Sequence, residues 1–80
     1  METGVILYFK KAKNAFVAAT GKGKVLLPLP ARQTLEGGQM RELRFSEPRL
    51  KPKQKDPVVF LEVEEKDSVL SAKAWALAQA

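Results

Sequence analysis

The sequence predicts an all-β domain, a small barrel of five strands. Short runs rich in β-branched and aromatic residues alternate with segments that carry Gly, Pro, Asn and Lys, a pattern typical of strands joined by tight turns. The 80 residues suffice for one domain with a single core, so we expect residues 1–80 to fold together. Five strands close a small barrel, whereas four leave unpaired edges.

The first three strands are expected to form a meander. Residues 5–9 (VILYF) and 15–20 (AFVAAT) should pair through a lysine-rich turn that ends at Asn14, because asparagine tolerates the left-handed conformation of such turns. The glycines of residues 20–24 make a second turn. A third strand follows at residues 25–30, and its two prolines, which lack N–H donors, place it at a sheet edge or a strand exit.

The middle of the chain contains more loop. Residues 32–39 should be a loop broken by two glycines, and residues 40–46 a strand with apolar and charged positions interleaved. Residues 47–57 contain three prolines and four basic residues, and we expect a mobile basic loop there. Residues 58–64 (VVFLEVE) are the clearest strand in the chain.

The C-terminal segment has two interpretations. Residues 65–68 (EKDS) can form a hairpin turn that leads into a strand over residues 69–78. They can equally precede a short helix with Ser68 as its N-cap, which the alanines favour by propensity. We favour the strand because five strands close a small barrel, whereas four leave bare edges.

The composition excludes several classes of function. The chain has no cysteine and no histidine, so we expect no disulfide, no zinc site and no Ser-His or Cys-His nucleophile pair. We predict neither catalytic residues nor a cofactor, and take the protein not to be an enzyme. The acidic residues of 62–67 are expected to be a solvated edge, not a metal site. The longest apolar run is too short to span a bilayer and no signal peptide is visible, which favours a cytoplasmic protein.

The charge is polarised along the chain. Residues 1–35 carry six basic residues against one acidic residue, whereas residues 56–80 carry two against five. A phosphate-facing side would account for this asymmetry, although a net charge of +5 also lies within what solubility requires.

Aromatic residues stand beside the lysines of the first hairpin. Strand alternation sends Tyr8 and Phe9 to opposite faces, and we expect Phe9 in the core and Tyr8 at the surface, with Phe16 able to join either. The alternative is that all three pack inside, and that the basic loop serves only solubility. Single-stranded nucleic acid is held by aromatic faces under its bases and by cations along its phosphates. The predicted binding residues are Tyr8, Phe16, Lys10, Lys11, Lys13, Lys22, Lys24, Arg44, Arg49, Lys51 and Lys53.

The order of these features resembles the cold-shock domain, a five-stranded OB-fold barrel that binds single-stranded RNA and DNA. Residues 4–9 are similar to its first motif, with Tyr8 in place of the stacking tryptophan, and residues 13–17 to a degraded form of its second. Residues 34–39 and 59–68 are similar to its later loop and hairpin. The chain departs from the family in its third strand, which lacks the expected aromatic and histidine residues, and in the extra stretch 40–57.

Two functions therefore stand as expectations. The first is binding of single-stranded RNA or DNA with little sequence preference by an OB-like barrel. The second is a non-enzymatic protein-interaction module that docks on a larger assembly, or on itself, through a sheet edge or the C-terminal segment. In that case Trp75 and Leu77 would be the anchors.

Overall fold

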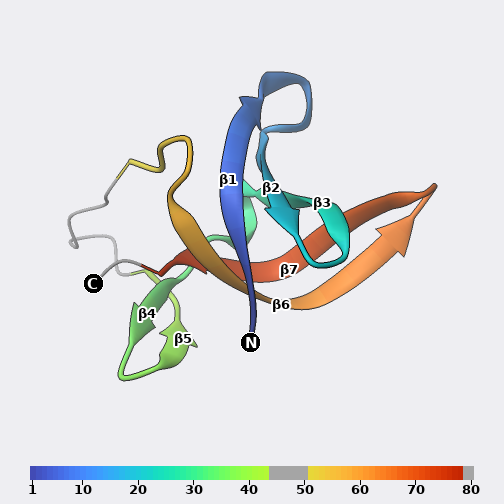
Figure 1. Ribbon diagram of the computed structural model, residues 1–80. Coiled ribbons are helices and arrows are strands. Elements are labelled where there is room, and N and C mark those ends of the chain that lie inside the picture. Colours follow the sequence, from blue (N-terminus) through green and yellow to red (C-terminus); the bar gives the residue numbers. More distant parts are fainter. Residues whose placement is uncertain (44–50, 79–80) are drawn as a thin grey trace.

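A computed structural model describes residues 1–43 and 51–78, which form a closed five-stranded barrel and a separate two-stranded hairpin (Figure 1). In the barrel, neighbouring strands follow the order β1-β2-β3-β7-β6. The barrel strands are β1 (Glu2–Lys10), β2 (Ala15–Thr20), β3 (Gly23–Pro28), β6 (Pro57–Lys66) and β7 (Val69–Leu77). The other elements are the short 3₁₀ helices η1 (Lys11–Lys13) and η2 (Leu29–Ala31) and the hairpin strands β4 (Thr34–Glu36) and β5 (Gln39–Arg41).

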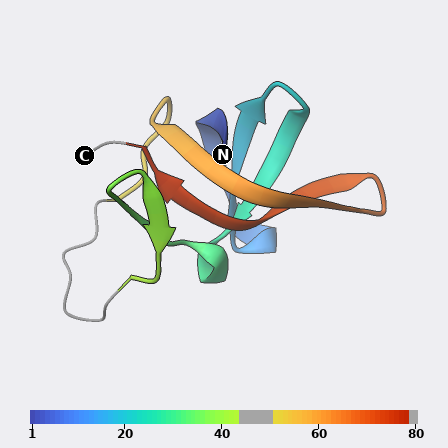
Figure 2. The same cartoon turned by 90° about the horizontal axis from the view of Figure 1, so that it is seen from below.

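The barrel closes through a parallel contact. All other neighbouring pairs are antiparallel, and β3 meets β7 in parallel at Val25–Leu70 and Leu26–Ser71. Figure 2 shows the barrel from below, with the β6–β7 hairpin reaching beyond the other strands. The predicted all-β class is confirmed, and the architecture is compatible with an OB-like fold. The C-terminal segment is a strand, not a helix.

The core lies inside the barrel. Its largest fully buried side chains are Trp75, Phe60 and Ile6, packed with Leu27, Val25 and Val58. These residues come from β1, β3, β6 and β7, so the core packs four of the five barrel strands together. The indole N–H of Trp75 donates to the backbone oxygen of Pro28 at 2.7 Å, and the only polar atom of that side chain is thereby satisfied.

A β-bulge in β1 decides which way the aromatic residues point. Ile6 pairs with Ala18 and Tyr8 pairs with Val17, so β1 carries one more residue than β2 at Leu7. An extra residue shifts the alternation of the strand by one position. Ile6 therefore faces the core, where it is 1% exposed, while Tyr8 faces outward at 48%.

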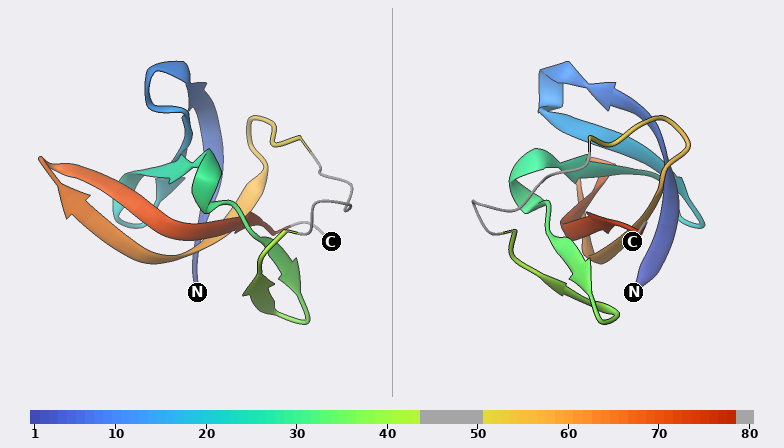
Figure 3. Two further views of the ribbon diagram at one scale, coloured as in Figure 1. Left: turned by 180° about the vertical axis from the view of Figure 1, so that it is seen from behind. Right: turned by 90° about the vertical axis from the view of Figure 1, so that its left-hand side faces the viewer.

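Several predicted boundaries were wrong. Residues 32–39 were expected as a loop and residues 40–46 as a strand, but residues 34–41 form the β4–β5 hairpin (Figure 3). Residues 44–46 of the expected strand lie outside the described residues. Gly37 and Gly38 both have positive φ, 60° and 79°, and so make its two-residue turn. The third strand ends at Pro28, and Pro30 lies in η2, because proline suits the first turn of a helix. Residues 47–50 of the predicted basic loop lie outside the described residues.

Gly4 permits a close approach between β1 and β2. A Cβ atom at this position would lie 2.8 Å from Cγ2 of Thr20 and 2.9 Å from the backbone oxygen of Ala19. The Thr20 hydroxyl donates to the oxygen of Gly23 and accepts from the N–H of Lys22, so its methyl cannot rotate away without breaking these bonds. The backbone oxygen of Ala19 cannot move without shifting β2.

We therefore expect Gly4→Ala to lower the free energy of unfolding by about 1–3 kcal/mol, as overpacking does. Chemical denaturation measures this change. Gly21→Ala is the matched control, since a Cβ there has no neighbour within 4 Å, and its effect should stay within about 0.5 kcal/mol. Equal stability of the two variants would show that β1 and β2 are not packed this closely.

Candidate nucleic-acid interface

The outer face of the barrel carries a row of side chains that crosses four strands. Tyr8 on β1 pairs with Val17 on β2, Val17 pairs with Leu26 on β3, and Leu26 pairs with Ser71 on β7. Directly paired residues share one face of a sheet. Tyr8 is thus the exposed aromatic end of a mainly apolar row.

Two of the predicted lysines flank this row. Lys10 lies two residues beyond Tyr8 on β1, and so shares its face. Lys24 lies two residues before Leu26 on β3, and is on the same face at the opposite side of the row. Both side chains are exposed. Positive charge therefore lies on each side of the Tyr8 ring.

The row borders a hollow of about 190 Å³. Tyr8, Lys10 and Lys24 line it together with Val17, Val25 and Leu26, and the beginning of β7 supplies the rest of its wall with Ser68, Val69 and Leu70. None of the described residues that line it is acidic. The hollow is open to solvent. Its lining residues carry one aromatic ring, the ammonium groups of Lys10 and Lys24, and the hydroxyl groups of Tyr8 and Ser68.

The β7 wall was not predicted from the sequence. It results from the parallel contact of β3 with β7, which joins segments about 45 residues apart, and from the tight turn before Val69. Asp67 and Ser68 both have positive φ, 53° and 64°, which is typical of a two-residue hairpin turn. The sequence signal for the turn was present at residues 65–68, but no local pattern indicates which strand pairs in parallel with which.

Phe16 does not join this surface and Phe9 is not buried, contrary to two expectations. The ring of Phe16 is half-buried, 4.9 Å from the ring of Phe9 and 5.9 Å from that of Trp75, with edge-to-face geometry in both pairs. Phe16 therefore packs against the core and does not stand beside Tyr8. Phe9, predicted to be core, is 42% exposed at the outer end of this aromatic chain. The bulge at Leu7 puts Phe9 on the side of β1 that Ile6 occupies, but Phe9 lies next to the end of the strand at Lys10 and stays exposed there.

Trp75 and Leu77, the predicted anchors of a protein partner, are buried at 0% and 8% exposure. Their side chains belong to the core cluster. A partner could reach them only after the barrel had opened. Each barrel strand also has a neighbour on both sides, so within the described ranges the barrel offers no fully free edge strand.

The other predicted basic residues lie in three places. Lys11 and Lys13 are exposed on η1, at the same end of the β1–β2 hairpin as Lys10. Lys22 is at the opposite end, where its Nζ atom lies 3.1 Å from Oε1 of Glu2. Lys51 and Lys53 are exposed before β6. Arg44 and Arg49 lie outside the described residues.

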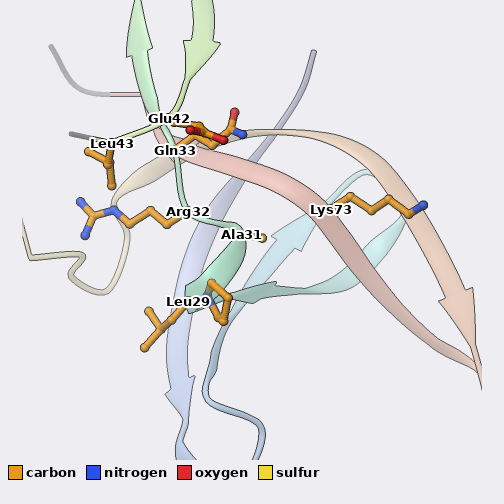
Figure 4. A pocket seen from close by; sticks show the side chains of 8 residues that line it. Leu29, Ala31, Arg32, Gln33, Glu42, Leu43 and Lys73 are labelled. Atoms are coloured by element: carbon orange, nitrogen blue, oxygen red, sulfur yellow. The ribbon is translucent and has the colours of Figure 1, made fainter. Parts of the chain in front are cut away.

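A larger hollow of about 540 Å³ lies beside η2. Figure 4 shows the Arg32 and Lys73 side chains pointing to opposite sides of it, with Glu42 and Gln33 close together between them. The guanidinium of Arg32 lies 5.8 Å from the centre of the Trp75 ring, a cation–π arrangement that stabilises the barrel. The cations do not converge here and a carboxylate is present, so this hollow suits a phosphate less well than the one at Tyr8.

Comparisons with family models, curated proteins and solved structures give no match to this chain. Over residues 1–43 and 51–78, no helix has the length and apolar character needed to cross a membrane. In the same ranges, the side chains of Asp and Glu form no group of three or more that could hold a metal ion.

Proposed function

We propose that the protein binds single-stranded nucleic acid, without catalysis, on the outer face of β1, β2 and β3. The observation that carries this proposal is the hollow beside Tyr8. An exposed ring that is flanked by two lysines can stack a base while the ammonium groups contact the phosphates on either side. Stacking contributes about 1–3 kcal/mol per base and depends little on base identity, so little sequence preference is expected.

The position of the hollow also supports the proposal. OB folds bind oligonucleotides on the face of their second and third strands and at the loops between strands 1 and 2 and strands 4 and 5. The corresponding parts of this barrel are β2, β3, η1 and the β6–β7 turn. The resemblance of residues 4–9 to the first cold-shock motif likewise implies a stacking role for Tyr8. Phe16 has no part in the proposed site, because its ring packs on Trp75.

A single strand suits this site better than a duplex. The Tyr8 ring lies in a hollow between the meander and the beginning of β7, and only an unstacked base can enter it. In a duplex the base faces are covered by neighbouring base pairs, so a protein reaches mainly phosphates and base edges.

Titration of labelled oligonucleotides tests the proposal. Single-stranded RNA, single-stranded DNA and the corresponding duplex, each of roughly 16 nucleotides so that it covers an OB fold, are compared between about 50 and 200 mM salt. We expect binding of the single strands that weakens as salt rises, and weaker binding of the duplex. Absence of single-strand binding at the lowest salt would refute the proposal. Self-association in sedimentation under those conditions would instead favour the interaction module.

A further inference from the structure

A second group of lysines lies along the other edge of β1. Residues 53–56 form a turn beside the upper half of β1 (Figure 1). The N–H of Lys55 donates to the backbone oxygen of Ile6 at 2.7 Å, and the N–H of Ile6 donates to the oxygen of Asp56 at 3.0 Å. β2 pairs with the opposite edge of β1 at this level. Lys55 is therefore fixed beside the bulge that turns Tyr8 outward.

The turn is closed by Asp56. Its Oδ2 accepts a hydrogen bond from the N–H of Lys53 at 2.8 Å, and its own N–H donates to the oxygen of Lys53 at 3.1 Å. The side chains of Lys53 and Lys55 are exposed. The last part of the predicted basic loop thus presents its lysines from a hydrogen-bonded turn that is attached to the barrel.

Lys55 adopts a backbone conformation that favours glycine. Its φ is 73°, in the left-handed region where a side chain costs roughly 1 kcal/mol or more. Glycine would adopt the same turn with less strain. The backbone geometry alone therefore does not account for a lysine at this position.

We propose that Lys55 contacts a phosphate of the bound strand on the β6 side of Tyr8, and that Asp56 is the residue that positions it. The inference rests on the proposed function and extends it. Lys55 lies on the β6 side of β1 and Lys24 lies on β3, on the β2 side of β1, while Lys10 is on β1 itself. A bound strand that contacts Lys55 and Lys24 therefore crosses β1 at Tyr8. Because phosphate contacts then lie on both sides of the base stacked on Tyr8, the site binds an internal stretch of a single strand in preference to a free mononucleotide.

The first test compares two lysine variants of equal charge in oligonucleotide titrations over the same salt range. Lys55→Gln should weaken binding roughly three- to tenfold and reduce the slope of log affinity against log salt by about 0.7, the loss of one phosphate contact to a single strand. Lys73→Gln is the control, because Lys73 pairs with Glu64 at 3.4 Å and lies beside the larger hollow. Its affinity should stay near that of the wild type. Equal losses in both variants would overturn the proposal.

The second test separates positioning from charge. Asp56→Asn and Asp56→Ala both remove one negative charge, but only the asparagine retains an oxygen that can accept from Lys53. If charge alone mattered, both variants would bind at least as tightly as the wild type. We expect Asp56→Ala to bind more weakly than Asp56→Asn, and equal affinities would contradict a positioning role.

A third variant separates loss of the phosphate contact from loss of folding stability. Lys55→Gly relieves the left-handed strain, so its melting temperature should equal or exceed that of the wild type, while its binding should weaken as in Lys55→Gln. Binding by Lys55→Gly at wild-type strength would refute the contact. If the wild type binds single strands and Tyr8→Ala weakens that binding, but Lys55→Gln does not, then only this inference fails. If the wild type does not bind, the proposed function itself fails.

Discussion

Trp75→Ala is expected to produce the largest loss of stability in the chain, about 3–5 kcal/mol. The indole is fully buried, contacts Phe16 and donates to the oxygen of Pro28. Its removal leaves a cavity at the centre of the barrel and an acceptor without its donor. Because small domains are stable by only about 5–15 kcal/mol, the melting temperature should fall by more than about 10 °C. Circular dichroism is the appropriate measurement, since Trp75 is the only tryptophan.

Trp75→Phe is the companion variant. It retains an aromatic ring in the core but loses the hydrogen bond to Pro28, so we expect a smaller loss of about 1–3 kcal/mol. A Trp75→Ala protein that melts within a few degrees of the wild type would contradict the central position of this side chain. That result would also reopen the possibility that Trp75 is a partner anchor on the surface.

Tyr8→Ala is expected to have the largest effect on function. Loss of one stacked base should weaken single-strand binding by about 1–3 kcal/mol, or roughly fivefold to 150-fold. Stability should change little, because the ring is 48% exposed on the outer face. Fluorescence anisotropy with single-stranded RNA and DNA measures the affinity, and thermal melting checks the fold.

Two controls make the Tyr8 result specific. Tyr8→Phe keeps the ring face, so its affinity should stay close to that of the wild type. Phe9→Ala removes a neighbouring ring of similar exposure, 42%, which faces the other side of the sheet and packs on Phe16. Weakening of binding by Phe9→Ala as large as that by Tyr8→Ala would place the binding surface elsewhere.

The long strands were predictable because their signals are local. Residues 5–9 and 58–64 are rich in β-branched and aromatic residues, and both lie in strands, β1 and β6. The left-handed Asn14, with φ of 51°, ends the turn as predicted. In these places the residue type and the backbone conformation that it favours agree.

The orientation of the aromatic side chains was only partly predictable. Nothing in the sequence around Leu7 indicates a bulge, since no glycine or proline marks it. A shift of one residue reverses every following side chain in the strand. The outward position of Tyr8 was expected and the exposure of Phe9 was not. The side of Phe16, which the sequence left open, is set by its contact with Trp75.

The walls of the candidate site depend on contacts between distant parts of the chain. The β7 wall requires the parallel pairing of Val25 with Leu70, and the Lys55 turn requires hydrogen bonds to Ile6. Strand pairing is set by the closure of the whole barrel, which local patterns do not encode. The lysine composition indicated a binding surface, but only the register shows that Lys10 and Lys24 flank Tyr8 while Lys22 does not.

Nitrogen-15 amide chemical shifts recorded during titration with a single-stranded oligonucleotide test the proposed site most directly. The largest changes should fall on Tyr8, Val17, Leu26 and Val69, around the smaller hollow, while η2 and the β4–β5 hairpin stay unchanged. Changes centred on Leu29 to Gln33 with Tyr8 unaffected would contradict the site, even if the protein binds nucleic acid.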